Sequence, residues 1–398
     1  MKCKVVITND NSIVQAHQLY KKNVLPGVVY LEIIFRYLQS RGMDVSRMKI
    51  YDIIFNKPVI ASESYDKCLT ITFTEESEKW HVRGSSRKVV EGITGVDEDE
   101  NFTAKLDFNN HNDELKIENL QVEALKKTAF KSVSMEYFYE KLREKGLIHF
   151  DFMKLDGDVY IGEEYILAEV SLSPSAAEQA QKYYIHPAFL DSAAIPIGGF
   201  IFQGDLNLNF NEITKPLIPM LIEGFCSYRP IKSNKAYVYI GKTDWRWSEK
   251  TKILATNIKM YTEDGKLAAV FSKFTVKEIR SVETLDFDSA KGKKGSTEKM
   301  PSDEIANEQD SDKPNEVLSF IQQELKSMMA RHLNRSAESI SLDQDYFDMG
   351  LDSIRLLEIL KEIENLLQKQ LYPTLLFEHD NIRNLSKYLE CEFGGHFN

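Results

Sequence analysis

Three residues far apart in the chain have side chains that could move protons or carry a covalently bound group: His17, Asp191 and Ser353. The pKa of an imidazole lies near neutral pH, so a histidine can serve as a general base. A carboxyl group that burial keeps protonated can serve as a general acid, and a serine hydroxyl can be covalently modified. Each of the three is also an ordinary structural residue, so the surrounding sequence has to decide between the interpretations.

Ser353 lies in the string Gly350-Leu351-Asp352-Ser353-Ile354. Apolar residues at spacings of three and four follow the serine, and this pattern predicts an amphipathic helix that begins there. A serine at the start of a helix is commonly an N-cap. Capping explains the serine but not the whole string inside a small helical module.

Residues 315–398 are predicted to form a small all-α bundle of four helices, with Ser353 at the head of the second. In this context the string resembles the phosphopantetheine attachment site of acyl carrier proteins. The resemblance implies that Ser353 carries a 4'-phosphopantetheine arm, whose thiol holds an acyl group as a thioester. The other four residues of the string complete the motif. Because a carrier performs no chemistry itself, the rest of the chain is expected to act on a tethered acyl thioester.

Residues 1–280 are rich in predicted strands, such as the alternating segment 165–172. Residues 263–266 are predicted to form a hairpin turn whose glycine takes a positive φ. Two helices interrupt the strands, and each begins after a proline, Pro26 or Pro187, which suits the first turn of a helix. The repeated order of short strands, proline, buried helix and long strands indicates a weak internal duplication.

His17 and Asp191 lie beside these two helices in recognisable motifs. His17 precedes Pro26 by nine residues, and Asp191 follows His186-Pro187 in a His-Pro then Leu-Asp pattern. The order of these motifs resembles the dehydratase domain of modular polyketide synthases. The resemblance implies an α+β, double hotdog fold, in which two long helices are each wrapped by an antiparallel sheet.

The resemblance also implies the chemistry, which is removal of water from a β-hydroxyacyl thioester. His17 would take the α-proton, and Asp191 would protonate the leaving hydroxyl group. Burial in an apolar acyl tunnel is expected to raise the pKa of Asp191 by more than the helix N-terminus lowers it. Gly27, at the start of the first helix, is a candidate N–H donor to the thioester oxygen. The further pocket candidates are Pro26, His186 and Pro187.

Three departures from the family pattern suggest an altered pocket or an altered reaction. Lys21 stands where the family has glycine. Ile195 stands four residues after Asp191, where a glutamine or histidine usually supports the acid. Residues 146–151, which include His149, stand where a Tyr-Gly-Pro segment is usual.

Composition limits the other classes of function. The 398 residues carry a formal net charge of −11, which argues against nucleic acid or an anionic membrane as the main partner. No apolar run is long enough to span a bilayer and no signal peptide is recognisable, so we expect a cytoplasmic protein. The four cysteines are scattered and form no metal-binding pattern, so we expect reduced thiols and no metal cofactor.

We therefore predict a dehydratase-like domain over residues 1–283, with halves at about 1–125 and 135–283, then a flexible linker over 284–314 and a carrier domain over 315–398. The resemblance implies three kinds of partner. These are a phosphopantetheinyl transferase, the ketosynthase and other polyketide synthase domains, and a second copy of the chain bound through the dehydratase-like domain.

Three hypotheses for the function stay open at this point. The first is a dehydratase–carrier didomain. The second is a dehydratase-like domain with another task, which could be double-bond migration, oxa-Michael cyclisation or support of chain branching. The third is a non-catalytic scaffold that presents the carrier, and the presence of both His17 and Asp191 argues against it.

Overall fold

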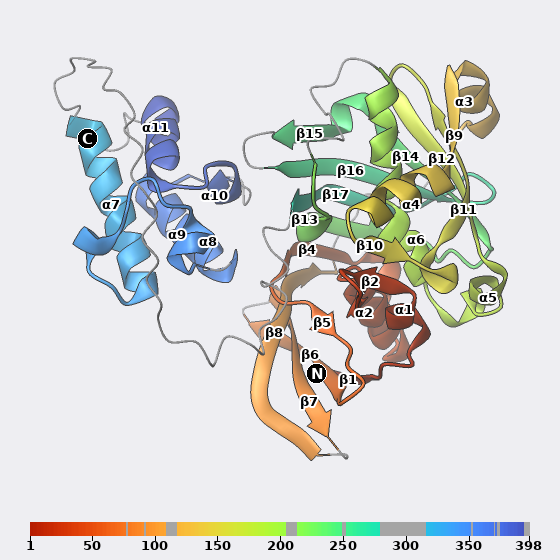
Figure 1. The fold of residues 1–398 in the computed structure, drawn as a ribbon, viewed down its shortest axis with the longest axis horizontal. Helices are drawn as coiled ribbons and strands as arrows, with labels where there is room; N and C mark the ends of the chain where they lie inside the picture. Colours follow the sequence, from red (N-terminus) through yellow and green to blue (C-terminus); the bar gives the residue numbers. More distant parts are fainter. Residues whose placement is uncertain are drawn as a thin grey trace. The chain divides into compact units, whose positions relative to one another are not determined.

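The chain divides into two compact units, Met1–Ile279 and Arg280–Asn398 (Figure 1). The computed structural model describes residues 1–76, 79–90, 93–108, 118–203, 213–248, 252–278, 316–351, 353–369, 371 and 375–393. The predicted linker, residues 284–314, lies outside the described residues.

The first half of the larger unit wraps a sheet around one long helix, α2 (Val29–Ser40). Its strands are β1 (Lys2–Ile7), β4 (Lys49–Phe55), β6 (Asp66–Glu76), β7 (Lys79–Val90) and β8 (Ile93–Asp107). Helix α2 is buried on most sides, as its nearly continuous apolar sequence predicts. Strand β4 is not continued by β5 (Val59–Ile60), which follows Pro58 and joins a different sheet.

The second half repeats this arrangement with a shorter helix. Its strands are β9 (Lys131–Ser134), β11 (Leu155–Ile161), β12 (Tyr165–Leu172), β13 (Leu217–Ser227), β14 (Lys235–Gly241), β15 (Trp245–Ser248), β16 (Ile253–Thr262) and β17 (Leu267–Glu278). The helical segment consists of α6 (Pro187–Ser192) and a 3-10 helix, η5 (Ile195–Gln203), so the second helix is split rather than long. Helix α3 (Val122–Thr128) lies between the halves in sequence, and α4 (Met135–Glu144) follows β9 within the second half.

The two halves share one antiparallel sheet. Strand β4 of the first half pairs with β13 of the second, which makes the sheet continuous across the junction (Figure 1). The hairpin between β16 and β17 has Gly265 at a φ of 77°, as predicted for residues 263–266. Two helices, each with an antiparallel sheet around it, form the predicted double hotdog fold.

A second, small sheet crosses between the halves and positions the candidate site. Strands β2 (His17–Leu19), β3 (Lys22–Leu25) and β5 come from the first half, whereas β10 (Leu147–His149) comes from the second. Strand β10 pairs with β2 in a register that sets His149 opposite His17. The small sheet therefore brings residues from both halves to one place.

The smaller unit is helical, as predicted. Its elements are α7 (Glu316–Leu333), α8 (Tyr346–Met349), α9 (Ser353–Leu367), α10 (Leu375–Glu378) and α11 (Ile382–Phe393). Leu356, Ile359, Leu360 and Ile363 form the buried face of α9. Within the described ranges of the whole chain, no helix is both long and apolar enough to cross a membrane.

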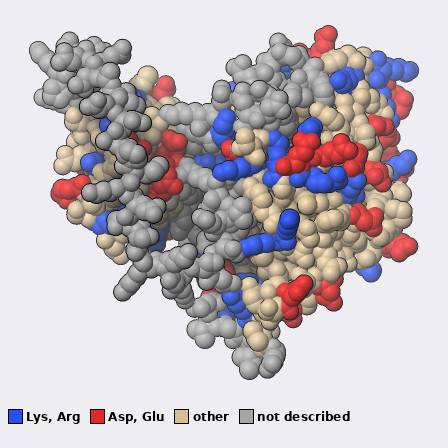
Figure 2. Space-filling model, in the orientation of Figure 1, with Lys and Arg blue, Asp and Glu red and all other residues tan. Residues whose placement is uncertain are grey.

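The surface of the larger unit mixes charges of both signs. On the face drawn in Figure 2, Lys and Arg lie among Asp and Glu. The larger unit contains ion pairs such as Lys259 with Glu118 and Lys273 with Glu223, each at 2.9 Å. On this face the charges are therefore interspersed and not gathered in one acidic field.

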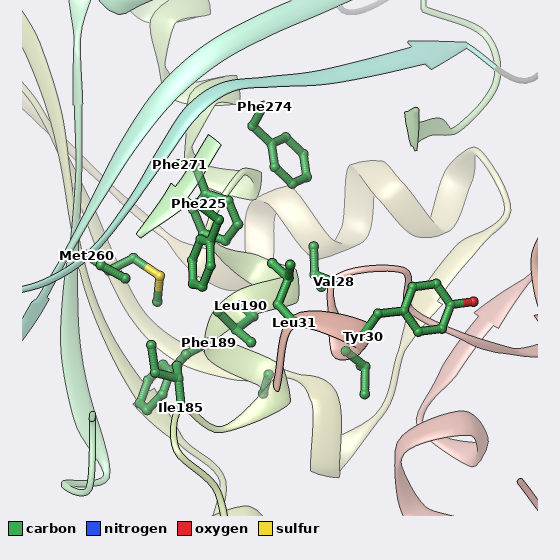
Figure 3. Packing of buried hydrophobic residues seen from close by; sticks show 14 of the residues in the cluster. Val28, Tyr30, Leu31, Ile185, Phe189, Leu190, Phe225, Met260, Phe271 and Phe274 are labelled. Atoms are coloured by element: carbon green, nitrogen blue, oxygen red, sulfur yellow. The ribbon is translucent and has the colours of Figure 1, made fainter. Parts of the chain in front are cut away.

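The main hydrophobic core contains the two central helices and the shared sheet. Figure 3 shows Leu31 of α2 in one apolar cluster with Leu190 of α6 and with Phe225 and Phe271 of β13 and β17. All four side chains are almost completely buried. Because the core is continuous across the halves, the segments that carry His17 and Asp191 are attached to one packed body.

Candidate functional site

His17 is held as a neutral histidine with one free nitrogen. Its Nδ1 atom lies 2.9 Å from the carbonyl oxygen of Val24 on the paired strand β3. A carbonyl oxygen only accepts hydrogen bonds, so Nδ1 carries the hydrogen and Nε2 keeps a lone pair. Burial lowers the pKa of His17, although the nearby Asp191 carboxylate acts in the opposite direction. The imidazole can therefore accept a proton at Nε2 near neutral pH.

Asp191 is presented to His17 by α6. Pro187 occupies the first turn of this helix, where a fixed φ favours helix initiation. The Oδ2 atom of Asp191 lies 4.0 Å from Nε2 of His17, and both side chains are largely buried. The structure thus brings together the two residues that the sequence placed in separate halves.

His149 is a third member of this cluster, and it was not among the predicted site residues. Its Nε2 atom lies 2.8 Å from Oδ2 of Asp191, and its ring packs edge to face on His17 with centroids 5.1 Å apart. Two features of the sequence indicated a different partner for Asp191. Residues 146–151 departed from the family pattern, and Ile195 left Asp191 without its usual partner.

The expected rise in the pKa of Asp191 is wrong in direction. Burial is the largest single influence and does raise the pKa, but His17 and the hydrogen bond with His149 together outweigh it. The pKa of Asp191 is therefore held below its ordinary value. The helix N-terminus is the one opposing influence that the local sequence shows, because nothing in it indicates that His149 would reach this carboxylate.

His186 has a structural role in this arrangement. Its Nδ1 atom accepts a hydrogen bond of 3.2 Å from the backbone N–H of Ala188, which caps the N-terminus of α6. Its ring is buried between Phe152 and Tyr183, at centroid distances of 5.0 and 4.8 Å. Burial lowers the pKa of His186 to about 4, so the cap stays neutral and intact near neutral pH.

Pro26 and Gly27 lie just before Val28, the N-cap of α2. The carbonyl oxygens of both residues accept the first backbone hydrogen bonds of the helix, from Val29 and Tyr30. A Cβ atom at residue 27 would come within 2.8 Å of the Phe55 ring, so glycine is required here for space. The N–H of Gly27 donates to no acceptor among the described residues, which leaves it available to a bound group.

In the smaller unit, Ser353 is the first residue of α9. Gly350 adopts a φ of 101°, which favours glycine, and the N–H of the buried Leu351 donates to the carbonyl oxygen of Tyr346. Asp352 lies outside the described residues. The backbone of Ile354 continues α9.

Family models match both units. The model described as "Polyketide synthase dehydratase domain" matches residues 4–87, and "Polyketide synthase dehydratase N-terminal domain" matches residues 118–286. The model described as "Phosphopantetheine attachment site" matches residues 323–389, which include Ser353. The chain belongs to the polyketide synthases, as a dehydratase-type domain followed by a carrier domain.

Two curated relatives are much longer than this chain. Polyketide synthase PksL of Bacillus subtilis (strain 168) is 26% identical over 406 aligned residues, which cover 99% of this chain. PksM of the same organism is 26% identical over 387 residues and 96% of this chain. The chain spans about 8% of the length of each of these relatives.

Solved dehydratases share the fold of the larger unit. An N-terminal dehydratase from the difficidin assembly line is 28% identical, with a TM-score of 0.64 over 72% of this chain and 96% of that one. A monomeric dehydratase domain from a trans-AT polyketide synthase split module has a TM-score of 0.63 over 70% of this chain and 99% of that one, at 20% identity.

The structure accounts for one departure of this dehydratase-type domain from the family motif. Tyr20 and Lys21 form the two-residue turn between β2 and β3, and their φ angles are 48° and 66°. Such a turn requires positive φ at both positions, which explains why glycine is usual at the second. Lys21 therefore keeps the backbone geometry beside His17 at some cost in conformational free energy.

The cluster also has the composition of a cation site. Potential ligand atoms of His17, His149 and Asp191 all lie within 4.8 Å of one another. However, 2.8 Å between His149 and Asp191 is a hydrogen-bond distance. A histidine that binds a metal normally donates its other N–H to an acceptor, whereas Nδ1 of His149 has no partner among the described residues. The geometry thus favours a hydrogen-bonded pair.

Proposed function

We propose that the dehydratase-type domain eliminates water from a β-hydroxyacyl thioester to give an α,β-unsaturated thioester. The observation that carries this proposal is the pair formed by His17 Nε2 and Asp191 Oδ2, 4.0 Å apart and buried. A neutral base and a carboxyl group at this spacing can reach adjacent carbons of one acyl chain.

The proton balance of the reaction assigns one step to each residue. His17 Nε2 takes the α-proton, the electron pair forms the double bond, and the carbon–oxygen bond to the hydroxyl group breaks. Asp191, in its protonated form, supplies the proton with which the hydroxyl group leaves as water. Transfer of the captured proton from His17 back to Asp191 restores both groups. The backbone N–H of Gly27 would stabilise the developing charge on the thioester oxygen.

The carrier domain would present the substrate. Ser353, at the head of α9 after the Gly350 turn, fits the attachment of 4'-phosphopantetheine by a phosphopantetheinyl transferase. When attached, the arm supplies the thioester bond that holds the acyl chain. A ketosynthase and other polyketide synthase domains would deliver and receive that chain, and we also propose that the domain forms a homodimer.

Double-bond migration is the second candidate function. The lowered pKa of Asp191 is the observation that favours it, because an ionised carboxylate has no proton to give to a leaving hydroxyl group. In a migration, His17 alone would remove a proton from one carbon and return it to another, and no water would leave.

Intact-mass analysis of the full chain, loaded with a β-hydroxyacyl group at Ser353, separates the two functions. Loss of one water supports the dehydratase. A β,γ-unsaturated substrate that shifts its double bond without any mass change, while the β-hydroxyacyl group stays intact, would replace the first proposal by the second.

Two variants test the individual roles through α-proton exchange in heavy water. His17→Ala should abolish exchange and reduce water loss by about a thousandfold, the effect of losing a general base. Asp191→Asn should stop water loss but retain exchange, because the base remains. Exchange that persists in His17→Ala would contradict the assignment of the base.

A further inference from the structure

The residue that usually supports the acid in this family is replaced by an apolar residue, Ile195, in this chain. Ile195 lies four residues after Asp191, begins η5 and packs against the hydrophobic core. An isoleucine side chain forms no hydrogen bond, so the carboxylate has to be oriented from elsewhere. The partner observed is His149, which lies on a strand far from α6 in the sequence.

We propose that His149 takes over this task, orienting the Asp191 carboxyl group toward the substrate and donating a hydrogen bond to it in each catalytic cycle. The inference rests on the proposed function, because it assigns a positioning residue to the same site.

The pairing of β2 with β10 connects His17, the base, with His149, which orients the acid Asp191. His149 lies opposite His17 in this pair, and just beyond it the N–H of Phe150 donates to the carbonyl oxygen of Ala16. Any shift of β10 relative to β2 would therefore move His149 away from Asp191 and also change the packing of the His17 ring. The two strands form one unit that holds His17 and His149, the base and the residue that orients the acid.

Tyr139 of α4 fixes the other side of His149. The two rings are 5.2 Å apart between centroids. The Tyr139 hydroxyl lies 2.8 Å from Oγ of Ser192, next to Asp191 in sequence, and accepts a 3.0 Å hydrogen bond from the N–H of Leu155. Both of these contacts are structural, so Tyr139 packs against His149 while its hydroxyl group is engaged elsewhere.

The hydrogen-bond geometry assigns the tautomer of His149. The Asp191 carboxylate only accepts, so Nε2 of His149 carries the hydrogen between them. The groups that face the carboxylate are His17 from β2 and His149 from β10, with Tyr139 from α4 nearby. The hydrogen bond from His149 stabilises the ionised form of Asp191, and removing it should make the carboxyl group harder to ionise.

Two variants of the full chain separate orientation from packing. His149→Phe keeps an aromatic ring beside Tyr139 but removes the hydrogen bond. His149→Gln keeps an N–H donor. His81→Phe, at a half-buried histidine on β7, is the matched control. Thermal melting of each variant shows whether the domain remains folded.

The first readout is independent of turnover. Full chain labelled with carbon-13 at the aspartate carboxyl carbons is titrated by NMR, and the Asp191 signal is assigned by its loss in Asp191→Asn. We expect the pKa of Asp191 to rise in His149→Phe, to change less in His149→Gln and to stay unchanged in His81→Phe. An unchanged titration in a folded His149→Phe variant would overturn the inference.

The second readout is the pH–rate profile of water loss. The limb set by the Asp191 carboxyl group should move to higher pH in His149→Phe, while the maximal rate falls by about tenfold or more and recovers in His149→Gln. If the wild type loses water and the profile is the same in His149→Phe, the inference fails and the proposed function stands. If the NMR titration shifts as expected but no substrate loses water, the proposed function fails and the link between His149 and Asp191 remains.

Discussion

Glu32 should make the stability of the dehydratase-type domain depend on pH. This residue of α2 is only 3% exposed, and its two carboxylate oxygens accept hydrogen bonds of 2.8 and 2.9 Å from the N–H groups of Tyr184 and Ile185. These two residues directly precede the His186 cap of α6. Glu32 therefore ties the central helix of the first half to the segment that presents Asp191.

The sign and size of the effect follow from the burial of this carboxyl group. Burial raises the pKa of Glu32 from 4.5 to about 7, although the two N–H groups, Arg36 and Lys232 act against it. Between these two pH values the folded chain holds a proton that the unfolded chain has released. The free energy of unfolding should thus fall as pH rises through this window, by about 3 kcal/mol from this group alone.

Urea unfolding followed by tryptophan fluorescence measures this effect in the full chain. All three tryptophans lie in the larger unit, so the signal reports that unit even while the carrier domain is attached. Glu32→Gln removes the titration, because an amide does not ionise in this range. The difference in stability between wild type and Glu32→Gln should therefore change by about 3 kcal/mol between pH 4.5 and pH 8.

The control for this measurement is Glu263→Gln, which replaces an exposed glutamate in the β16–β17 turn. Its stability should run parallel to that of the wild type across the same range. If the difference between wild type and Glu32→Gln stays constant within about 1 kcal/mol, Glu32 does not hold a proton in the folded domain and the reasoning is refuted.

Two further predictions concern the turn and the carrier. Lys21→Gly should raise the free energy of unfolding by up to about 1 kcal/mol, because glycine adopts the positive φ of this turn without steric cost. Lys21→Ala removes the charge but keeps the Cβ atom, so an equal gain in that variant would contradict the conformational explanation. Ser353→Ala should leave the helices of the smaller unit intact by circular dichroism but abolish the mass gain when a phosphopantetheinyl transferase and coenzyme A are added. A mass gain that persists in this variant would place the attachment site elsewhere.

The local sequence was sufficient to predict those structural features that depend only on neighbouring residues. The apolar spacing after Ser353 predicted α9, and the prolines at residues 26 and 187 marked the approach to both central helices. The turn at residues 263–266 followed from the conformational freedom of its glycine. These features are decided by steric and hydrogen-bonding preferences within a few residues, so they can be read without knowledge of the fold.

Only the tertiary structure decided how the acid is supported. His149 reaches Asp191 because β10 pairs with β2 across the two halves, and a register shifted by one residue would turn its side chain to the opposite face. The direction of the pKa of Asp191 depends on the same contact, since burial alone would have raised it. The conformation of Lys21 could not be predicted from the local sequence either. Its positive φ is imposed by the tight turn that joins β2 to β3 in the small sheet. Long-range strand pairing and the sum of opposing electrostatic effects are properties of the packed chain, and no local pattern encodes them.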